Sequence, residues 1–143
     1  MTTITEDYVS FEIAKLLKEK GFDEDCWCWY EEDGYLRESN DDFGVQSNSD
    51  HVVDDDEYNC SAPTIQMAMK WLREVHHLYI DVGFGNDYKG EFLYMGDIYD
   101  LTKDAIYAKY KPIIEADDYL FANPKTYEEA CEAAIKYCLE HLI

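Results

Sequence analysis

The sequence predicts an α+β fold in which three helices alternate with two β-hairpins. Three segments carry apolar residues at helical spacing beside recognisable capping residues. Two further segments are rich in aromatic and β-branched residues and are interrupted by turn sequences. The expected order is helix–hairpin–helix–hairpin–helix, with an antiparallel sheet and the helices packed on one face. A length of 143 residues suits a single domain over residues 1–143.

The first helix is expected over residues 11–20. Ser10 can cap its N-terminus, and Ile13 and Leu17 lie on one face. Gly21 follows at the position where a left-handed residue ends many helices.

The first hairpin is expected from residues 26–30 and 35–37. The first of these segments is dense in aromatic residues, which favours a strand. Asp33 and Gly34 between them are typical of a two-residue hairpin turn, because both residue types tolerate a positive φ.

A long acidic loop is expected over residues 39–59. Residues 23–60 contain fourteen acidic residues and one basic residue, Arg37, so most of the net charge of −20 lies there. The segment shows little apolar periodicity, and we expect it to be exposed and to add little to the core. Its spacing does not match a calcium-binding loop. The acidic residues are densest at Asp54, Asp55 and Asp56.

The second helix is expected over residues 64–76, after Pro63, which suits a first helical turn. The second hairpin follows, with strands over residues 79–84 and 91–99. Residues 101–110 fit a short helix or another strand equally well. The last helix is expected over residues 127–142, because Thr126 and Glu129 form a capping box.

Composition excludes several classes of protein. A net charge of −20 and a pI near 4.2 exclude a conventional nucleic-acid-binding protein and argue against binding to an anionic membrane. The N-terminal residues lack the features of a signal peptide, and no apolar run approaches the length of a membrane span. Five cysteines fit no secreted disulfide framework. We therefore expect a cytoplasmic protein.

No catalytic or metal-binding constellation is apparent. Cys26 and Cys28 would share a strand face, but adjacent His76 and His77 point about 100° apart on a helix, so at most one could join them. The acidic surroundings also work against a reactive thiolate. We expect no catalytic residues, no metal, no cofactor and no disulfide.

Thirteen tyrosines and three tryptophans favour contact with another protein. Trp27 and Trp29 share a strand face, and Tyr35 lies across the turn, so these three residues are candidates for binding. The alternative is that this hairpin face is part of the core.

Three helical segments carry a resemblance. Residues 8–23, 62–76 and 126–140 resemble small uncharacterised proteins of gut anaerobes and their phages or prophages. That group has no established activity, so the resemblance implies no site residues. It implies only that the chain is a small cytosolic accessory protein, encoded by a mobile element.

The favoured hypothesis is a non-catalytic protein-interaction module. The alternative is an acidic decoy of a nucleic-acid-binding protein, as an anti-restriction protein would be, with Asp54, Asp55 and Asp56 among its contacts. A small thiol or metal enzyme is the poorer alternative.

Overall fold

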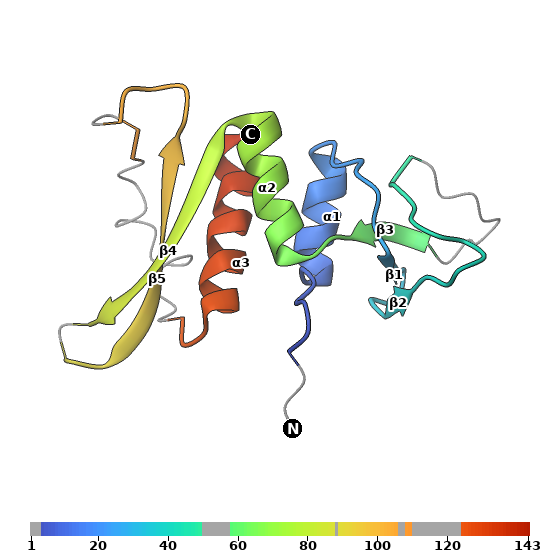
Figure 1. Cartoon of the computed structure of the whole chain (residues 1–143), viewed down its shortest axis with the longest axis horizontal. Coiled ribbons are helices and arrows are strands. Elements are labelled where there is room, and N and C mark those ends of the chain that lie inside the picture. The colour runs from blue at the N-terminus through green and yellow to red at the C-terminus, as the bar shows by residue number, and fades with distance from the viewer. Residues whose placement is uncertain (1–3, 50–57, 88, 106–107, 110–123) are drawn as a thin grey trace. The chain divides into compact units, whose positions relative to one another are not determined.

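The computed structural model describes residues 4–49, 58–87, 89–105, 108–109 and 124–143 (Figure 1). The chain divides into two compact units, Met1–Met67 and Ala68–Ile143, and each is described by itself. The predicted α+β class, the antiparallel pairing of strands and the three helices are confirmed.

Helix α1 (Phe11–Glu19) begins as the sequence predicts. The Ser10 hydroxyl accepts a hydrogen bond from the Ile13 N–H at 3.3 Å. Gly21 has a φ of 95° just after the helix, which only glycine adopts at little cost. The helix contributes its apolar face to the core of the first unit, where the buried residues include Val9, Ile13, Ala14, Leu17 and Phe22.

A three-stranded antiparallel sheet completes the first unit. Strands β1 (Cys28–Glu31), β2 (Leu36–Glu38) and β3 (Tyr58–Ala62) lie in the order β2-β1-β3. Tyr30 joins the sheet to α1, because its ring lies 5.2 Å from that of Phe11 and its hydroxyl donates to the Val9 carbonyl at 2.6 Å.

The turn between β1 and β2 differs from the predicted two-residue turn. Glu31 N–H donates to the Tyr35 carbonyl at 3.1 Å, so residues 32–34 form a three-residue turn. Among the residues of this turn, only Gly34 has a positive φ, at 82°. Asp33 instead uses its carboxylate to accept the Tyr35 N–H at 2.9 Å, which favours this longer turn.

The acidic segment also corrects the prediction. Tyr58 and Asn59 belong to β3, and Tyr58 is buried. Ser39, Gln46 and Ser47 are buried as well, so both ends of the expected loop contribute to the first unit. Residues 50–57, which include the three consecutive aspartates of the sequence prediction, lie outside the described residues.

Neutral polar side chains explain why residues 39–49 pack so closely. The Asn48 amide donates to the Phe22 carbonyl at 2.7 Å and accepts the Ser61 N–H at 2.8 Å. Gln46 and Cys26 exchange two backbone hydrogen bonds at 2.8 and 2.9 Å. Backbone groups that the sheet leaves unpaired are therefore satisfied by this segment.

The second unit contains most of α2 (Ile65–His76), a long hairpin and the last helix. Strands β4 (Leu78–Asn86) and β5 (Phe92–Asp100) pair antiparallel over their whole lengths. Helix α3 (Tyr127–Tyr137) continues into a π-helical turn, η2 (Cys138–Leu142). The predicted hairpin and the predicted helices over these residues are thus observed.

Helix α3 covers one face of the β4–β5 hairpin. A Cβ atom at Gly96 would lie 3.3 Å from the Ala134 Cβ and 3.4 Å from the Ala130 carbonyl oxygen. Ile80 and Ile98 form a cross-strand pair on this face, and both are buried. The close contact explains why a glycine and two alanines stand at these positions.

A single sheet with all helices on one face is not what the structure shows. The first unit contains one sheet and the second unit contains another, and no pairing joins them among the described strands. Strand β3, which the sequence analysis missed, extends the first hairpin to three strands. Sequence periodicity specifies which face of a strand is apolar, but it does not specify the strand's partners.

Residues 101–110 follow neither predicted alternative where they are described. Residues 101–105 form a turn, and the Ala108 carbonyl accepts the Asp100 N–H at 2.7 Å. Lys109 makes an isolated bridge to Tyr99. Within the part of the chain that the structure describes, no helix is long and apolar enough to cross a membrane.

The packing at Gly96 yields a stability prediction. We expect Gly96→Val to lower the free energy of unfolding by about 1–3 kcal/mol, because the added methyl groups collide with α3. Urea unfolding followed by circular dichroism measures the change. Gly83→Val is the matched control, since a Cβ there would meet nothing within 4 Å, and it should cost nothing. Equal losses in the two variants would contradict the packing of α3 on this face.

Candidate functional site

The predicted aromatic candidates lie in the first unit, and they are not equally exposed. Tyr35 is 58% exposed, whereas Trp27 and Trp29 are half-buried. The Trp27 indole N–H donates to Glu38 Oε1 at 3.1 Å. The Trp29 ring stacks on Tyr58, with ring centroids 6.1 Å apart. The tryptophans therefore belong largely to the packed sheet.

Strand register brings Trp29 and Tyr35 onto one face. Trp29 lies opposite Arg37, and Glu31 lies opposite Tyr35. The Arg37 guanidinium contacts both neighbours on this face, with Nε 3.0 Å from Glu31 Oε1 and the guanidinium carbon 4.3 Å from the Tyr35 ring centroid. Its charge is thus already compensated within the sheet. The remaining candidates, Asp54, Asp55 and Asp56, lie outside the described residues.

The environments of the five cysteines disfavour the thiolate form. All five are free and buried. Burial raises the pKa of the Cys26 and Cys138 thiols to about 12. It raises the pKa of the Cys60 and Cys131 thiols to about 11. Because the thiolate is the reactive form, these environments oppose nucleophilic chemistry.

His76, the last residue of α2, packs against an aromatic side chain of the same helix. Its ring meets the Trp71 ring edge to face, with centroids 4.6 Å apart. Its Nε2 atom is buried without a hydrogen bond, and burial lowers the pKa of the imidazole. Nowhere in the described ranges do three or more His, Cys, Asp or Glu side chains gather as metal ligands would.

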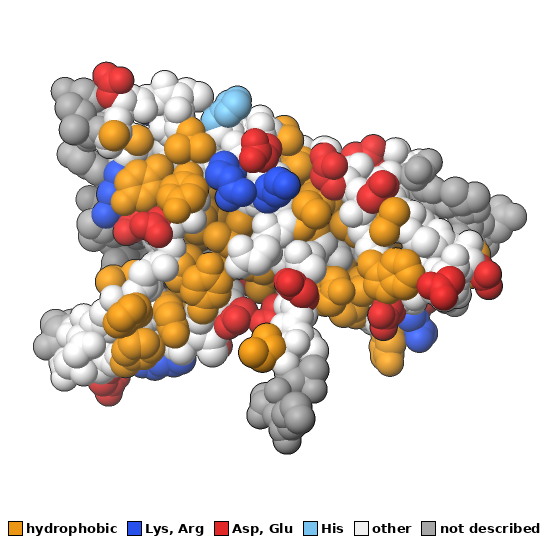
Figure 2. Space-filling model, viewed as in Figure 1, with side chains coloured by type: hydrophobic (Ala, Val, Ile, Leu, Met, Phe, Trp, Pro, Cys, Tyr) orange, Lys and Arg blue, Asp and Glu red, His pale blue; other side chains and the backbone are white. Residues whose placement is uncertain are grey.

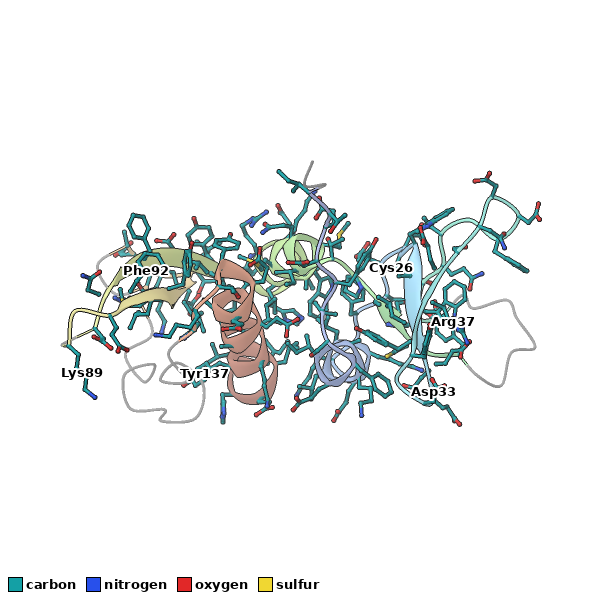
Figure 3. All side chains as sticks on the ribbon, turned by 90° about the horizontal axis from the view of Figure 1, so that it is seen from below. Cys26, Asp33, Arg37, Lys89, Phe92 and Tyr137 are labelled. Carbon is teal, nitrogen blue, oxygen red and sulfur yellow. The ribbon has the colours of Figure 1, made fainter. Side chains whose placement is uncertain are left out.

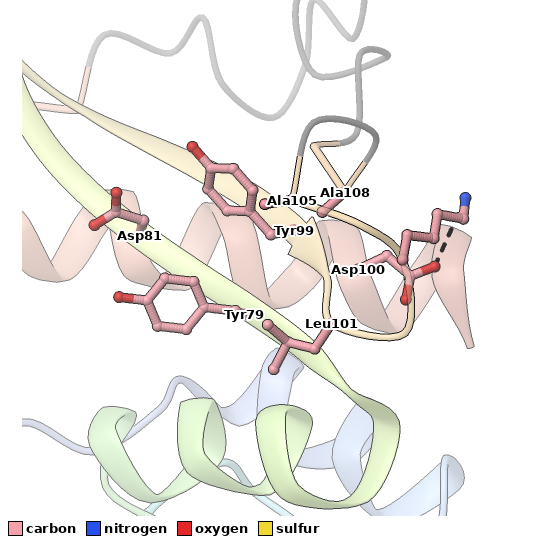
Figure 4. A pocket seen from close by; sticks show the side chains of 8 residues that line it. Tyr79, Asp81, Tyr99, Asp100, Leu101, Ala105 and Ala108 are labelled. Atoms are coloured by element: carbon pink, nitrogen blue, oxygen red, sulfur yellow. Dashed lines mark ion pairs between the residues drawn. The ribbon is translucent and has the colours of Figure 1, made fainter.

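A pocket of about 320 Å³ lies on the face of the β4–β5 hairpin opposite the one that α3 covers (Figure 4). We call it the open face, because no helix in the described part of the chain covers it. Tyr79 and Tyr99 form a cross-strand pair within it, and their ring centroids are 6.2 Å apart. Asp81 lies two residues along β4, on the same face. Sequence reasoning missed this pocket, although the Tyr-x-Asp and Asp-x-Tyr spacings at residues 79–81 and 97–99 are a signal once strand register is known.

Two carboxylates face each other across the hairpin at this pocket. Asp81 lies directly opposite Asp97, an arrangement that is unfavourable for like charges. Asp97 is compensated by Lys109, whose Nζ lies 3.3 Å from its Oδ1. Among the residues that the structure describes, none forms an ion pair or hydrogen bond with the Asp81 side chain. Within this part of the chain, one negative charge at the pocket is therefore left uncompensated.

The same hairpin carries an exposed aromatic cluster near its tip, which we define as Phe84, Phe92 and Tyr94. Phe84 is 73% exposed and Phe92 is 48% exposed. Ring centroids are 5.9 Å apart for Phe84 and Phe92, and 5.2 Å apart for Phe92 and Tyr94. Apolar side chains gather over this hairpin in Figure 2, and Figure 3 marks Phe92 on β5 and Lys89 in the hairpin loop.

A second pocket, of about 460 Å³, lies in the first unit beside β2. Two of its charged side chains already have partners, because Arg37 pairs with Glu31 and Glu38 accepts from Trp27. The remaining lining residues are Thr5, Glu6, Tyr8, Cys28 and Leu36.

No protein-family model, curated protein or solved structure matches the chain.

The buried thiols yield a prediction about reactivity. At pH 8 we expect an aromatic disulfide reagent to leave the cysteines of the folded protein unmodified during the time in which it modifies all five in the unfolded chain. The physical reason is the combination of burial and raised thiol pKa. Absorbance of the released thiolate measures the reaction. One cysteine that reacts at the unfolded rate would support the thiol-enzyme alternative.

Proposed function

We propose that the chain is a non-catalytic module that binds another protein in the cytoplasm. The observation that carries this proposal is the exposed aromatic cluster on the β4–β5 hairpin. Met95, which is 48% exposed, follows Tyr94 on β5 but lies on the opposite face of the hairpin. Aromatic residues and methionine are enriched at the centres of protein interfaces. A stable two-stranded hairpin that leaves such side chains in water gains from a partner that covers them.

The chemistry of the polar side chains supports a role without catalysis. Buried thiols with a raised pKa are poor nucleophiles, and Arg37 is held by Glu31 and Tyr35. The aromatic cluster itself contains no general base or metal ligand. A binding surface requires neither.

Charge limits the class of partner. A net charge of −20 repels nucleic acid and anionic membranes, so neither is part of the proposal. It favours a protein with basic residues beside its apolar contact. The resemblance of the three helical segments supports a phage or prophage setting.

The test places a photo-crosslinking amino acid at position 84 of the full chain in the cell that produces it. We expect a specific crosslinked protein, and we expect the yield to fall severalfold when Phe92→Ser is added, because the neighbouring ring of the cluster is then lost. Mass spectrometry identifies the product. The control carries the crosslinker at position 66, where an exposed glutamine faces solvent on α2.

Equal crosslinking from positions 84 and 66 would contradict the proposal. So would a yield at position 84 that is unaffected by Phe92→Ser, provided that circular dichroism shows the variant to be folded.

The acidic decoy is a second candidate, favoured by the surface of the first unit. Residues 23–49 contain nine acidic residues and one basic residue, and eight of these nine acidic side chains are exposed. Glu31 is the buried exception, and it pairs with Arg37. Acidic side chains gather over this unit in Figure 2. Such a surface suits contact with the basic groove of a nucleic-acid-binding protein.

Salt dependence separates the two candidates. A decoy should displace duplex DNA from a basic DNA-binding protein, and its affinity should fall by about tenfold or more between 50 and 200 mM salt. The combined variant Asp41→Asn and Asp42→Asn should weaken the displacement further, because both side chains are exposed. Fluorescence anisotropy of labelled DNA measures it. Binding through the aromatic cluster should fall much less with salt than binding by a decoy, because the larger part of that contact is apolar.

A further inference from the structure

We propose that the pocket on the open face of the β4–β5 hairpin binds the guanidinium group of an arginine side chain of the partner protein. This inference rests on the proposed function, because it names the chemistry of the partner segment at that hairpin. The pocket combines two aromatic rings with one carboxylate that no described residue compensates.

The geometry of the two tyrosines suits a flat cation. Tyr79 and Tyr99 are paired across the strands, with ring centroids 6.2 Å apart and planes inclined at 44°. Figure 4 shows both hydroxyls directed toward the end of the pocket at which Asp81 lies. A cation between the rings meets their negative faces, and the hydroxyl oxygens can accept its N–H groups.

The charges around the pocket favour a cation at Asp81. Asp97 is paired with Lys109, and Asp100 is paired with Lys103 at 3.7 Å. Asp100 also accepts two hydrogen bonds from Thr102, at 2.9 and 2.6 Å. The two lysines are thus held by their own aspartates. A cation that enters the pocket meets the Asp81 carboxylate and relieves its repulsion with the carboxylate opposite.

Guanidinium fits this set of groups better than a metal ion or an ammonium group. One free carboxylate and two phenol oxygens are too few for calcium, which takes six to eight oxygen ligands. A guanidinium group stacks on aromatic rings and forms two parallel hydrogen bonds to one carboxylate. Leu101, Ala105 and Ala108 also line the pocket, and they can pack against the methylene groups of an arginine.

The outer edge of β4 indicates that the arginine belongs to an extended segment. The Asp100 and Tyr94 N–H groups donate to Ala108 and Pro124, away from β4. Their opposite residues, Leu78 and Phe84, therefore turn their own backbone groups toward the outer edge of β4, as do Ile80 and Val82 between them. The described residues of the second unit leave this edge without a strand partner. A partner strand there would place alternate side chains on the open face, beside Asp81.

The first experiment titrates the full chain with N-acetyl-arginine amide and follows backbone amides by NMR. We expect saturable shifts at Tyr79, Asp81 and Tyr99, with an affinity in the millimolar range. The citrulline analogue has the same shape without the charge, and it should bind about tenfold more weakly.

Variants locate the carboxylate. Asp81→Asn should weaken binding of the arginine amide by about tenfold, because a charge-assisted hydrogen bond is lost. Tyr79→Phe should bind the arginine amide nearly as tightly as the unchanged protein, because the ring and not the hydroxyl supplies most of the contact. Tyr79→Ser removes the ring and should bind more weakly. Glu128→Gln is the matched control: it changes the net charge equally at an exposed position on α3, and it should leave the affinity unchanged.

A second titration distinguishes a peptide from a free guanidinium compound. A five-residue peptide with arginine at its centre and valine on both sides should bind more tightly than the single residue and should also shift the amides of Ile80, Val82 and Phe84. Peptide binding without those shifts would restrict the inference to free guanidinium compounds and overturn the extended segment.

Equal binding of the arginine and citrulline compounds, or no saturable shift, would overturn the guanidinium site itself. The proposed function fails separately. If crosslinking at position 84 captures a partner and Asp81→Asn does not lower the yield, the proposed function stands and the arginine site is contradicted. If the arginine amide binds but no partner is captured, the arginine site stands and the proposed function is contradicted.

Discussion

The close contact between α3 and β5 at Gly96 is the constraint on which the second unit depends. Because residue 96 has no side chain and Ala134 has a small one, the helix lies directly on the strand pair, and Ile80 and Ile98 are buried beneath it. Strand residues alternate between faces, so Tyr79, Asp81, Met95 and Tyr99 necessarily lie on the other face. The packing of one face thus leaves the pocket of Tyr79, Asp81 and Tyr99 on the opposite face, whereas the aromatic cluster lies on the same face as Gly96, closer to the hairpin tip.

The first unit combines many acidic side chains with a small core. Charged side chains are costly to bury, whereas amides and hydroxyls can be buried if they are hydrogen-bonded. Asn48 accordingly connects the Phe22 carbonyl to the Ser61 N–H, and Ser49 binds the Asp23 carboxylate through its N–H and its hydroxyl, both at 2.6 Å. Neutral side chains and backbone groups hold the segment, so most of its acidic side chains remain exposed.

Local signals explain what the sequence could predict. The three helices are found within a residue or two of their predicted starts, because Ser10 and Thr126 cap them and a proline precedes α2. Strand β3 was missed because Asn59 and Ser61 interrupt its apolar character beside the acidic run. The pairing of Trp29 with Arg37 and of Tyr79 with Tyr99 depends on strand register, which turn geometry sets and composition does not. The sequence therefore placed Trp29 and Tyr35 on one strand face correctly, whereas their role in binding stays a prediction and the pocket was not predicted.

Isotope-edited NOE spectroscopy of the full chain measures directly which face of the β4–β5 hairpin meets α3. We predict a strong NOE between the Gly96 α-protons and the Ala134 methyl group, and an NOE between the Tyr79 and Tyr99 rings without any contact of either ring to that methyl group. An NOE from the Ala134 methyl group to the Tyr79 or Tyr99 ring would place the helix on the other face, and it would contradict both the packing and the proposed pocket.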